Sequence, residues 1–133
     1  MPKKPRLLVV DEEGDNLDLL YRTFGREFQV FRANSPASAM EIMDTEGEMA
    51  VIISDQSMPE MTGVEFLGKT KDRFPDTIGI LLTGYDHDKL GDEGEEIDFS
   101  HVFKCVTKPW QPEEFKAVIQ EALKKYLAAK PPR

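Results

Sequence analysis

The stretch AVIISDQSMPEMTG, residues 50–63, contains the pattern that decides the fold. Its apolar run, residues 51–53, has no polar alternation, which is typical of a strand buried on both faces of a parallel sheet. The run leads directly to an acid, Asp55, and a stiff turn containing Pro59 and Gly63 follows. An acid in this place is by itself an ordinary turn former, so its meaning depends on the rest of the chain.

Short apolar runs and amphipathic segments alternate along the whole sequence. Four further runs are expected to be strands: LLVV (7–10), FQVFRA (28–33), IGILL (78–82) and VFKCV (102–106). Helical periodicity is found between them and after the last, in residues 15–24, 35–44, 62–74 and 112–130. Residues 86–100 should hold the fourth of five helices, although Gly91 and Gly94 weaken it.

This alternation predicts an α/β fold. Strands joined by helical crossovers form right-handed units, which give a parallel sheet covered by helices on both faces. We therefore expect a (βα)5 three-layer sandwich with five parallel strands. The order 2-1-3-4-5 would place the first and third strands side by side.

Length and composition favour one intracellular domain. The chain has 133 residues, and we expect one domain over residues 1–133, with a core of about 6–128 and a tail or linker start at 129–133. A formal charge of −8 argues against direct binding to nucleic acid. No apolar run reaches the length of a signal peptide or membrane span, and a single cysteine, Cys105, fits a reducing compartment. We expect a cytoplasmic protein without a membrane partner.

Five polar residues follow the ends of four expected strands: Asp11, Glu12, Asp55, Thr83 and Lys108. The carboxyl ends of parallel strands share one edge of the sheet, where ligands bind at the point of reversed strand order. In the order 2-1-3-4-5 the three acids converge there. Three carboxylates repel one another unless a cation lies between them. A site with oxygen ligands that is open to solvent favours Mg²⁺ over zinc.

These residue types predict phosphoryl chemistry. A carboxylate beside Mg²⁺ and an ammonium can act as a nucleophile and form an aspartyl phosphate, while both cations neutralise the transferring oxygens. Taken singly, each residue has an ordinary interpretation. Asp55 would be a turn former, Asp11 and Glu12 a solvated loop, Thr83 a helix cap and Lys108 a surface lysine. Their common placement at one edge of the sheet favours the functional interpretation.

Four motifs in order, LLVVDEE, SDQSMPEMTG, LLTGY and TKPW, resemble those of response-regulator receiver domains of two-component signalling. The resemblance covers residues 6–128 and implies the flavodoxin-like fold shared with CheY-like proteins. It implies that Asp55 is the phosphoacceptor. It also implies that the chain is a signalling receiver rather than an enzyme, catalysing only its own phosphorylation and dephosphorylation.

The resemblance assigns roles to the neighbours of Asp55. Asp11, Glu12 and Asp55 would hold Mg²⁺ together with the backbone carbonyl of Ser57. Thr83 would be the switch hydroxyl and Lys108 the cation that pairs with the phosphoryl group.

Four further positions also match the family. Pro109 would follow Lys108 through a bond that is often cis. Gly84 would leave room for the phosphoryl group, and Ser57 and Tyr85 would tune dephosphorylation.

The resemblance also implies partners. A sensor histidine kinase or phosphotransfer protein would phosphorylate Asp55, and an output domain or effector protein would respond. The switching surface would be the fourth helix (86–100), the fifth strand and the last helix, with 86–100 as the two-state element. A homodimer could form through the same surface.

Three positions depart from the family pattern. Glu12 stands where Asp is commoner, Gln56 replaces an apolar or aromatic residue, and Cys105 replaces the Tyr or Phe of the switch. These departures leave an alternative open, in which the chain is a pseudo-receiver acting as a phosphorylation-independent docking module. A Mg²⁺-dependent phosphohydrolase is disfavoured, because it would need an acid where this chain has Ser57.

Overall fold

The computed structural model describes residues 4–84 and 101–129. Five parallel strands form one sheet in the order β2-β1-β3-β4-β5, as the sequence predicts. The strands are β1 (Arg6–Val10), β2 (Gln29–Ala33), β3 (Val51–Asp55), β4 (Ile78–Thr83) and β5 (Lys104–Thr107). The helices are α1 (Gly14–Phe24), α2 (Pro36–Glu46), α3 (Gly63–Arg73) and α4 (Pro112–Ala129). The helix expected at 86–100 and the role assigned to Tyr85 lie outside the described residues.

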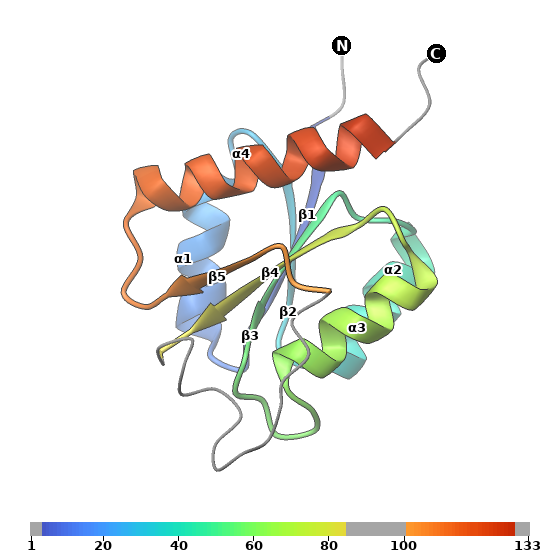
Figure 1. Cartoon of the computed structure of the whole chain (residues 1–133). Coiled ribbons are helices and arrows are strands. Elements are labelled where there is room, and N and C mark those ends of the chain that lie inside the picture. Colours follow the sequence, from blue (N-terminus) through green and yellow to red (C-terminus); the bar gives the residue numbers. More distant parts are fainter. Residues whose placement is uncertain (1–3, 85–100, 130–133) are drawn as a thin grey trace, which may run out of the picture.

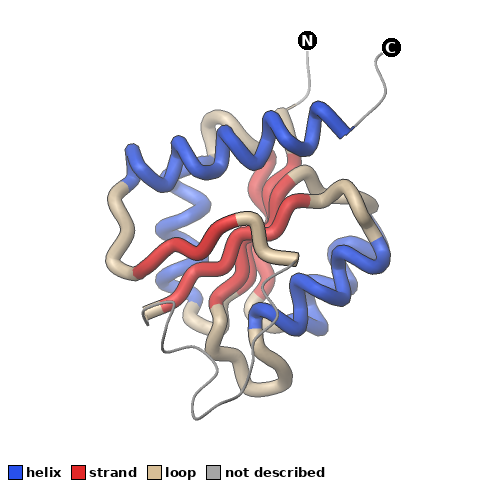
Figure 2. Tube along the Cα trace, viewed as in Figure 1, coloured by secondary structure: helices blue, strands red, loops and turns tan. Residues whose placement is uncertain are grey.

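The molecule has three layers. Helices α1 and α4 cover one face of the sheet, and α2 and α3 cover the other (Figures 1 and 2). Successive strand side chains enter opposite cores: Leu7 and Val9 pack with α1 and α4, whereas Leu8 and Val10 pack with α2 and α3. This period of two explains why the inner strands read as continuous apolar runs, since both of their faces are buried.

Helix starts follow the capping residues in the sequence. The Ser35 hydroxyl accepts a hydrogen bond from the Ser38 N–H before α2, with Pro36 in the first turn. Thr62 forms a capping box with Glu65 before α3. Each cap satisfies an N–H group that the helix itself leaves unpaired.

Two expectations need correction. The fifth strand starts at Lys104 rather than residue 102, since its register with β4 begins at the pair of Lys104 with Ile80. Leu127 lies in the segment 112–130 whose apolar periodicity predicts the last helix, yet it is 57% exposed. Burial declines along α4, from the fully buried Phe115 and Ile119 to this last turn.

In the part of the chain that the structure describes, no helix is both long enough and apolar enough to cross a bilayer.

Candidate functional site

Three of the predicted residues meet at the carboxyl edge of the sheet. Asp11 directly follows β1 and Asp55 ends the adjacent β3. Lys108 follows β5, and its Nζ donates to Asp55 Oδ1 at 3.0 Å and lies 3.7 Å from Asp11 Oδ2. Both acids are nearly buried, with 1% of Asp11 and 9% of Asp55 exposed. One ammonium is therefore shared between two buried carboxylates.

Asp11 is fixed in place by its neighbours in the chain. Its Oδ1 accepts the backbone N–H of Glu13 at 2.9 Å, and its Oδ2 accepts the side-chain amide of Asn16 at 3.1 Å. Its own N–H donates to the Ala33 carbonyl at the end of β2. The contribution of Asn16 was missed in the sequence, where the only signal is a polar residue in the first turn of the following helix.

The burial of this cluster shifts two pKa values. Desolvation raises the pKa of Asp55 above its ordinary value, and the charge of Asp11 adds to this, although Lys108 opposes it. For Lys108, burial acts to lower the pKa. The hydrogen bond to Asp55 and the charges of Asp55, Asp11 and Glu13 outweigh burial, so the pKa of Lys108 is raised. The two carboxylates at this edge thus carry more negative charge than the single ammonium of Lys108 neutralises.

The loop after β3 approaches the sheet closely. A Cβ placed on Gly63, the first residue of α3, would lie 2.4 Å from the backbone oxygen of Asp55 and 2.7 Å from Leu81 Cδ1. Only glycine allows this approach, which explains the glycine at the end of the quoted stretch. The tight turn therefore brings the start of α3 against the strand end that carries Asp55.

Thr83 lies beside the carboxylates but belongs to a different strand. It is buried at the end of β4, pairs in register with Thr107, and its carbonyl accepts the Lys108 N–H at 2.8 Å. Among residues 4–84 and 101–129, no atom lies within 4 Å of a Cβ added to the next residue, Gly84. The bond between Lys108 and Pro109 is cis.

Two of the residues predicted to hold the metal lie at the surface, unlike Asp11 and Asp55. Glu12 and Ser57 are both exposed. Within residues 4–84 and 101–129, no three acids, histidines or cysteines are grouped closely enough to hold a metal ion. The predicted acidic triad is therefore present as a pair, Asp11 and Asp55, with Lys108 between them.

A hard divalent cation nevertheless fits this arrangement. Mg²⁺ is commonly held by one or two carboxylates with water completing its shell. Asp11 and Asp55 provide two carboxylates that share one ammonium, and both side chains offer a metal oxygen atoms alone. The buried excess of negative charge supports the same conclusion.

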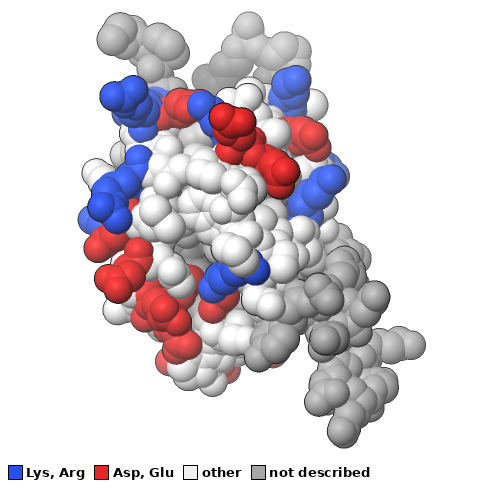
Figure 3. Space-filling view, turned by 90° about the vertical axis from the view of Figure 1, so that its left-hand side faces the viewer, with Lys and Arg blue, Asp and Glu red and all other residues white. Residues whose placement is uncertain are grey.

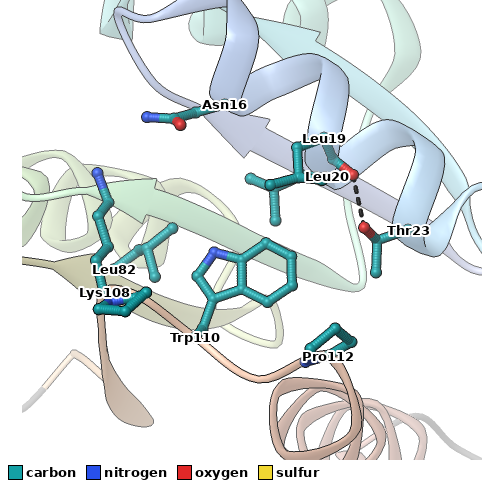
Figure 4. A pocket seen from close by; sticks show the side chains of 9 residues that line it. Asn16, Leu19, Leu20, Thr23, Leu82, Lys108, Trp110 and Pro112 are labelled. Atoms are coloured by element: carbon teal, nitrogen blue, oxygen red, sulfur yellow. Dashed lines mark hydrogen bonds between the residues drawn. The ribbon is translucent and has the colours of Figure 1, made fainter.

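An apolar groove of about 460 Å³ opens next to the site, between α1 and the segment joining β5 to α4 (Figure 4). Leu19, Leu20, Leu82, Trp110 and Pro112 form most of its wall, while the Lys108 stem and Asn16 lie at the end nearest the carboxylates. Figure 3 shows this side of the molecule as a broad uncharged area with acidic side chains at its border.

Trp110 both packs and lines this groove. Its ring lies 6.1 Å from the Phe24 ring and 4.9 Å from the Phe115 ring. Trp110 therefore packs against the start of the last helix. The groove itself was not foreseen.

A family model described as response regulator receiver domain matches residues 7–120. This chain belongs to that family. The resemblance seen in the four motifs is confirmed, as is the CheY-like flavodoxin fold, and the chain is a receiver domain, a signalling module of two-component systems.

Relatives of this receiver domain differ in architecture. The hydrogenase transcriptional regulatory protein HoxA of Cupriavidus necator is 31% identical over 91% of this chain but only 24% of its own length. The chain therefore spans about a quarter of this relative. Sporulation initiation phosphotransferase F of Bacillus subtilis is 29% identical over 94% of this chain and 95% of its own length.

One solved structure bears on the metal. The response regulator TrrA from Thermotoga maritima, in complex with Mg²⁺ and BeF, superposes with a TM-score of 0.77 at 26% identity, covering 90% of this chain and 99% of that one. That regulator thus holds Mg²⁺ on the same fold.

Cys105 lies on β5, half-buried against the α2–α3 core. Burial raises the pKa of its thiol. In this receiver domain a thiol therefore stands on the strand that was expected to carry the switch aromatic.

Proposed function

We propose that this receiver domain accepts a phosphoryl group on Asp55 from a phosphohistidine of a sensor kinase or phosphotransfer protein. The observation that carries the proposal is the burial of Asp55 beside Asp11, with Lys108 Nζ at 3.0 Å. A nearly buried carboxylate at the carboxyl edge of an α/β sheet, next to a fixed ammonium, meets the requirements for a nucleophile in phosphoryl transfer.

The chain and its phosphodonor partner together supply every group that the reaction needs. A carboxylate oxygen of Asp55 attacks phosphorus, the P–N bond to the donor imidazole breaks, and the imidazole leaves with the electron pair. Lys108 neutralises charge on the transferring oxygens, and the Thr83 hydroxyl turns toward the new phosphoryl group. Removal of the group by water regenerates the Asp55 carboxylate.

Asp11 and Asp55, with Glu12 and the Ser57 carbonyl, would hold Mg²⁺, which would supply charge neutralisation for the transfer. The exposed Glu12 has a longer side chain than aspartate and can reach the ion directly or through water. Addition of about two negative charges on phosphorylation would then be balanced by the metal and Lys108.

The groove beside Lys108 suits the approach of the donor. It is apolar, lies directly next to the Asp55 site and exposes Leu19 to solvent. A donor protein would bury this surface while its histidine reaches Asp55. The signal would leave through the surface that includes β5 and α4, either to an output domain or effector protein or to a second copy of the chain.

A second candidate is a pseudo-receiver that acts as a docking module without phosphorylation. It is favoured by the exposure of Glu12, which leaves two acids in the cluster among the described residues, and by Cys105 on β5. The two candidates differ in their response to metal, because a docking module has no need for Mg²⁺ near Asp55.

The deciding experiment incubates the protein with acetyl phosphate or phosphoramidate and Mg²⁺ and measures the intact mass. Phosphoryl acceptance predicts a gain of one phosphoryl group that requires Mg²⁺ and is absent in Asp55→Asn. Ser54→Ala, one residue before Asp55, is a matched control that should retain the gain. A protein that shows no gain, and no Mg²⁺-dependent change in its amide spectrum, would instead support the docking module.

A further inference from the structure

Gln56 is the first residue after β3, and only 8% of it is exposed. A buried amide side chain needs hydrogen-bond partners. Its backbone N–H donates to the Leu82 carbonyl at 3.1 Å, which extends the pairing of β3 with β4 by one residue beyond Asp55. The main chain is thus still held by the sheet at the point where the phosphoacceptor loop begins.

Gln56 also binds the first turn of α3 through two carbonyl groups. Its backbone carbonyl accepts the Gly63 N–H at 3.0 Å, and its side-chain Oε1 accepts the Val64 N–H at 3.1 Å. Such N–H groups have no partner inside the helix and are usually capped by the residue just before it. Here the cap comes from the end of the preceding strand, so the two bonds close a loop over residues 57–62.

The other end of this loop is held independently. The Thr62 hydroxyl accepts the Glu65 N–H at 3.2 Å, and the Thr62 carbonyl accepts the Phe66 N–H at 3.0 Å. Gln56 and Thr62 together therefore satisfy the first four N–H groups of α3, residues 63–66. The loop between them is fixed at both of its ends.

We propose that Gln56 is a positioning residue that orients the Ser57 carbonyl toward the metal of the Asp55 site. This inference rests on the proposed Mg²⁺-dependent function. The Gln56 carbonyl belongs to the peptide that joins Gln56 to Ser57, so the three hydrogen bonds on Gln56 hold this peptide in place and limit the positions from which the Ser57 carbonyl extends. The short oxygen distances that Mg²⁺ requires make its affinity sensitive to such orientation.

Of the three hydrogen bonds on Gln56, the one made by its side chain can be removed by mutation. Gln56→Met keeps the length of the side chain but removes the acceptor of the Val64 N–H. Thr77→Val is the matched control: Thr77 is also buried, and its hydroxyl donates to the Met49 carbonyl at 2.7 Å at the opposite edge of the sheet. Each variant loses one buried bond from a side chain to the backbone.

Two readouts test whether Gln56 positions the Ser57 carbonyl. Mg²⁺ titration, followed by amide chemical shifts, should show about ten-fold weaker binding in Gln56→Met and a change within about two-fold in Thr77→Val, whose site is distant. Amide exchange without metal should be about ten-fold faster at Val64 in Gln56→Met. Gln56→Glu keeps the acceptor oxygen and should restore protection of this amide. With acetyl phosphate, Gln56→Met should need more Mg²⁺ for half-maximal phosphorylation but reach the wild-type rate at saturation.

The outcomes separate this inference from the function on which it rests. Wild-type protein that binds Mg²⁺, with Gln56→Met binding it equally well, would overturn the role of Gln56 and leave the function intact. Equal weakening in Gln56→Met and Thr77→Val would also overturn it, because general loss of stability would then explain the result. Wild-type protein without any Mg²⁺ response would overturn the function itself and this inference with it.

Discussion

Substitution of Gly63 by alanine tests the close contact between the Asp55 strand and α3. The new Cβ would lie 2.4 Å from the Asp55 backbone oxygen, about 1 Å inside an ordinary contact. That oxygen cannot move easily, since it ends a central strand and also accepts the Ser54 hydroxyl at 2.9 Å. The start of α3 must therefore retreat, and we expect the free energy of unfolding to fall by about 2–3 kcal/mol.

Gly14 provides a matched control, because it too is the first residue of a helix, and no atom of the described residues lies within 4 Å of an added Cβ there. Gly14→Ala should leave stability unchanged or raise it by up to ~1 kcal/mol through helix propensity. Urea unfolding followed by CD should lower the midpoint of Gly63→Ala by about 1 M for an m-value of about 2 kcal/mol/M. Equal midpoints for the two alanine variants would refute the steric reasoning.

Four further predictions concern the charged site and the thiol. Lys108→Met should lower the free energy of unfolding at pH 7 by about 1–3 kcal/mol, because two buried carboxylates lose their shared cation; unchanged urea unfolding would contradict this. Because the pKa of Asp55 is raised, the Asp55 carboxyl stays protonated to higher pH in the folded state than in the unfolded chain. The free energy of unfolding therefore falls as pH rises above 3.8 and Asp55 becomes charged. Asp55→Asn should therefore gain stability over wild type between pH 4 and 7 in urea titrations, rather than lose it. Mg²⁺ at ten times its dissociation constant should stabilise wild type by about 1.4 kcal/mol in thermal melts, reversibly with EDTA, and stabilise Asp55→Asn less. Cys105 should react more slowly with iodoacetamide at pH 8 than an exposed thiol, because burial raises its pKa, and a rate equal to that of free cysteine would contradict its packing.

The sheet could be predicted because its signal is local. The continuous apolar run at 51–53 requires burial on both faces, and its repetition in β1 and β4 requires helices on two sides. Strand order then brings Asp11, Asp55 and Lys108 to one edge, although Lys108 lies 53 residues from Asp55 in the chain. The carboxylate pair and its ammonium thus follow from topology alone.

The rest of the site depends on side-chain directions and loop paths, which periodicity does not encode. The bond from Asn16 to Asp11 needs the first turn of α1 in place, and the bond from Gln56 to Val64 needs the full path of the loop. The exposure of Glu12 has the same origin, because adjacent residues at a strand end point in different directions. The groove beside Trp110 arises from the spacing of α1 and the segment before α4, elements that are remote in sequence.

The most direct test of phosphoryl acceptance locates the modified atom. Protein treated with acetyl phosphate and Mg²⁺ is reduced with borohydride, which converts an aspartyl phosphate to homoserine, and the peptides are sequenced by tandem mass spectrometry. Homoserine at position 55, dependent on Mg²⁺ and on the phosphodonor, is the expected result. Homoserine at another aspartate, or none in protein that retains its fold, would contradict the assignment of Asp55 as the phosphoacceptor.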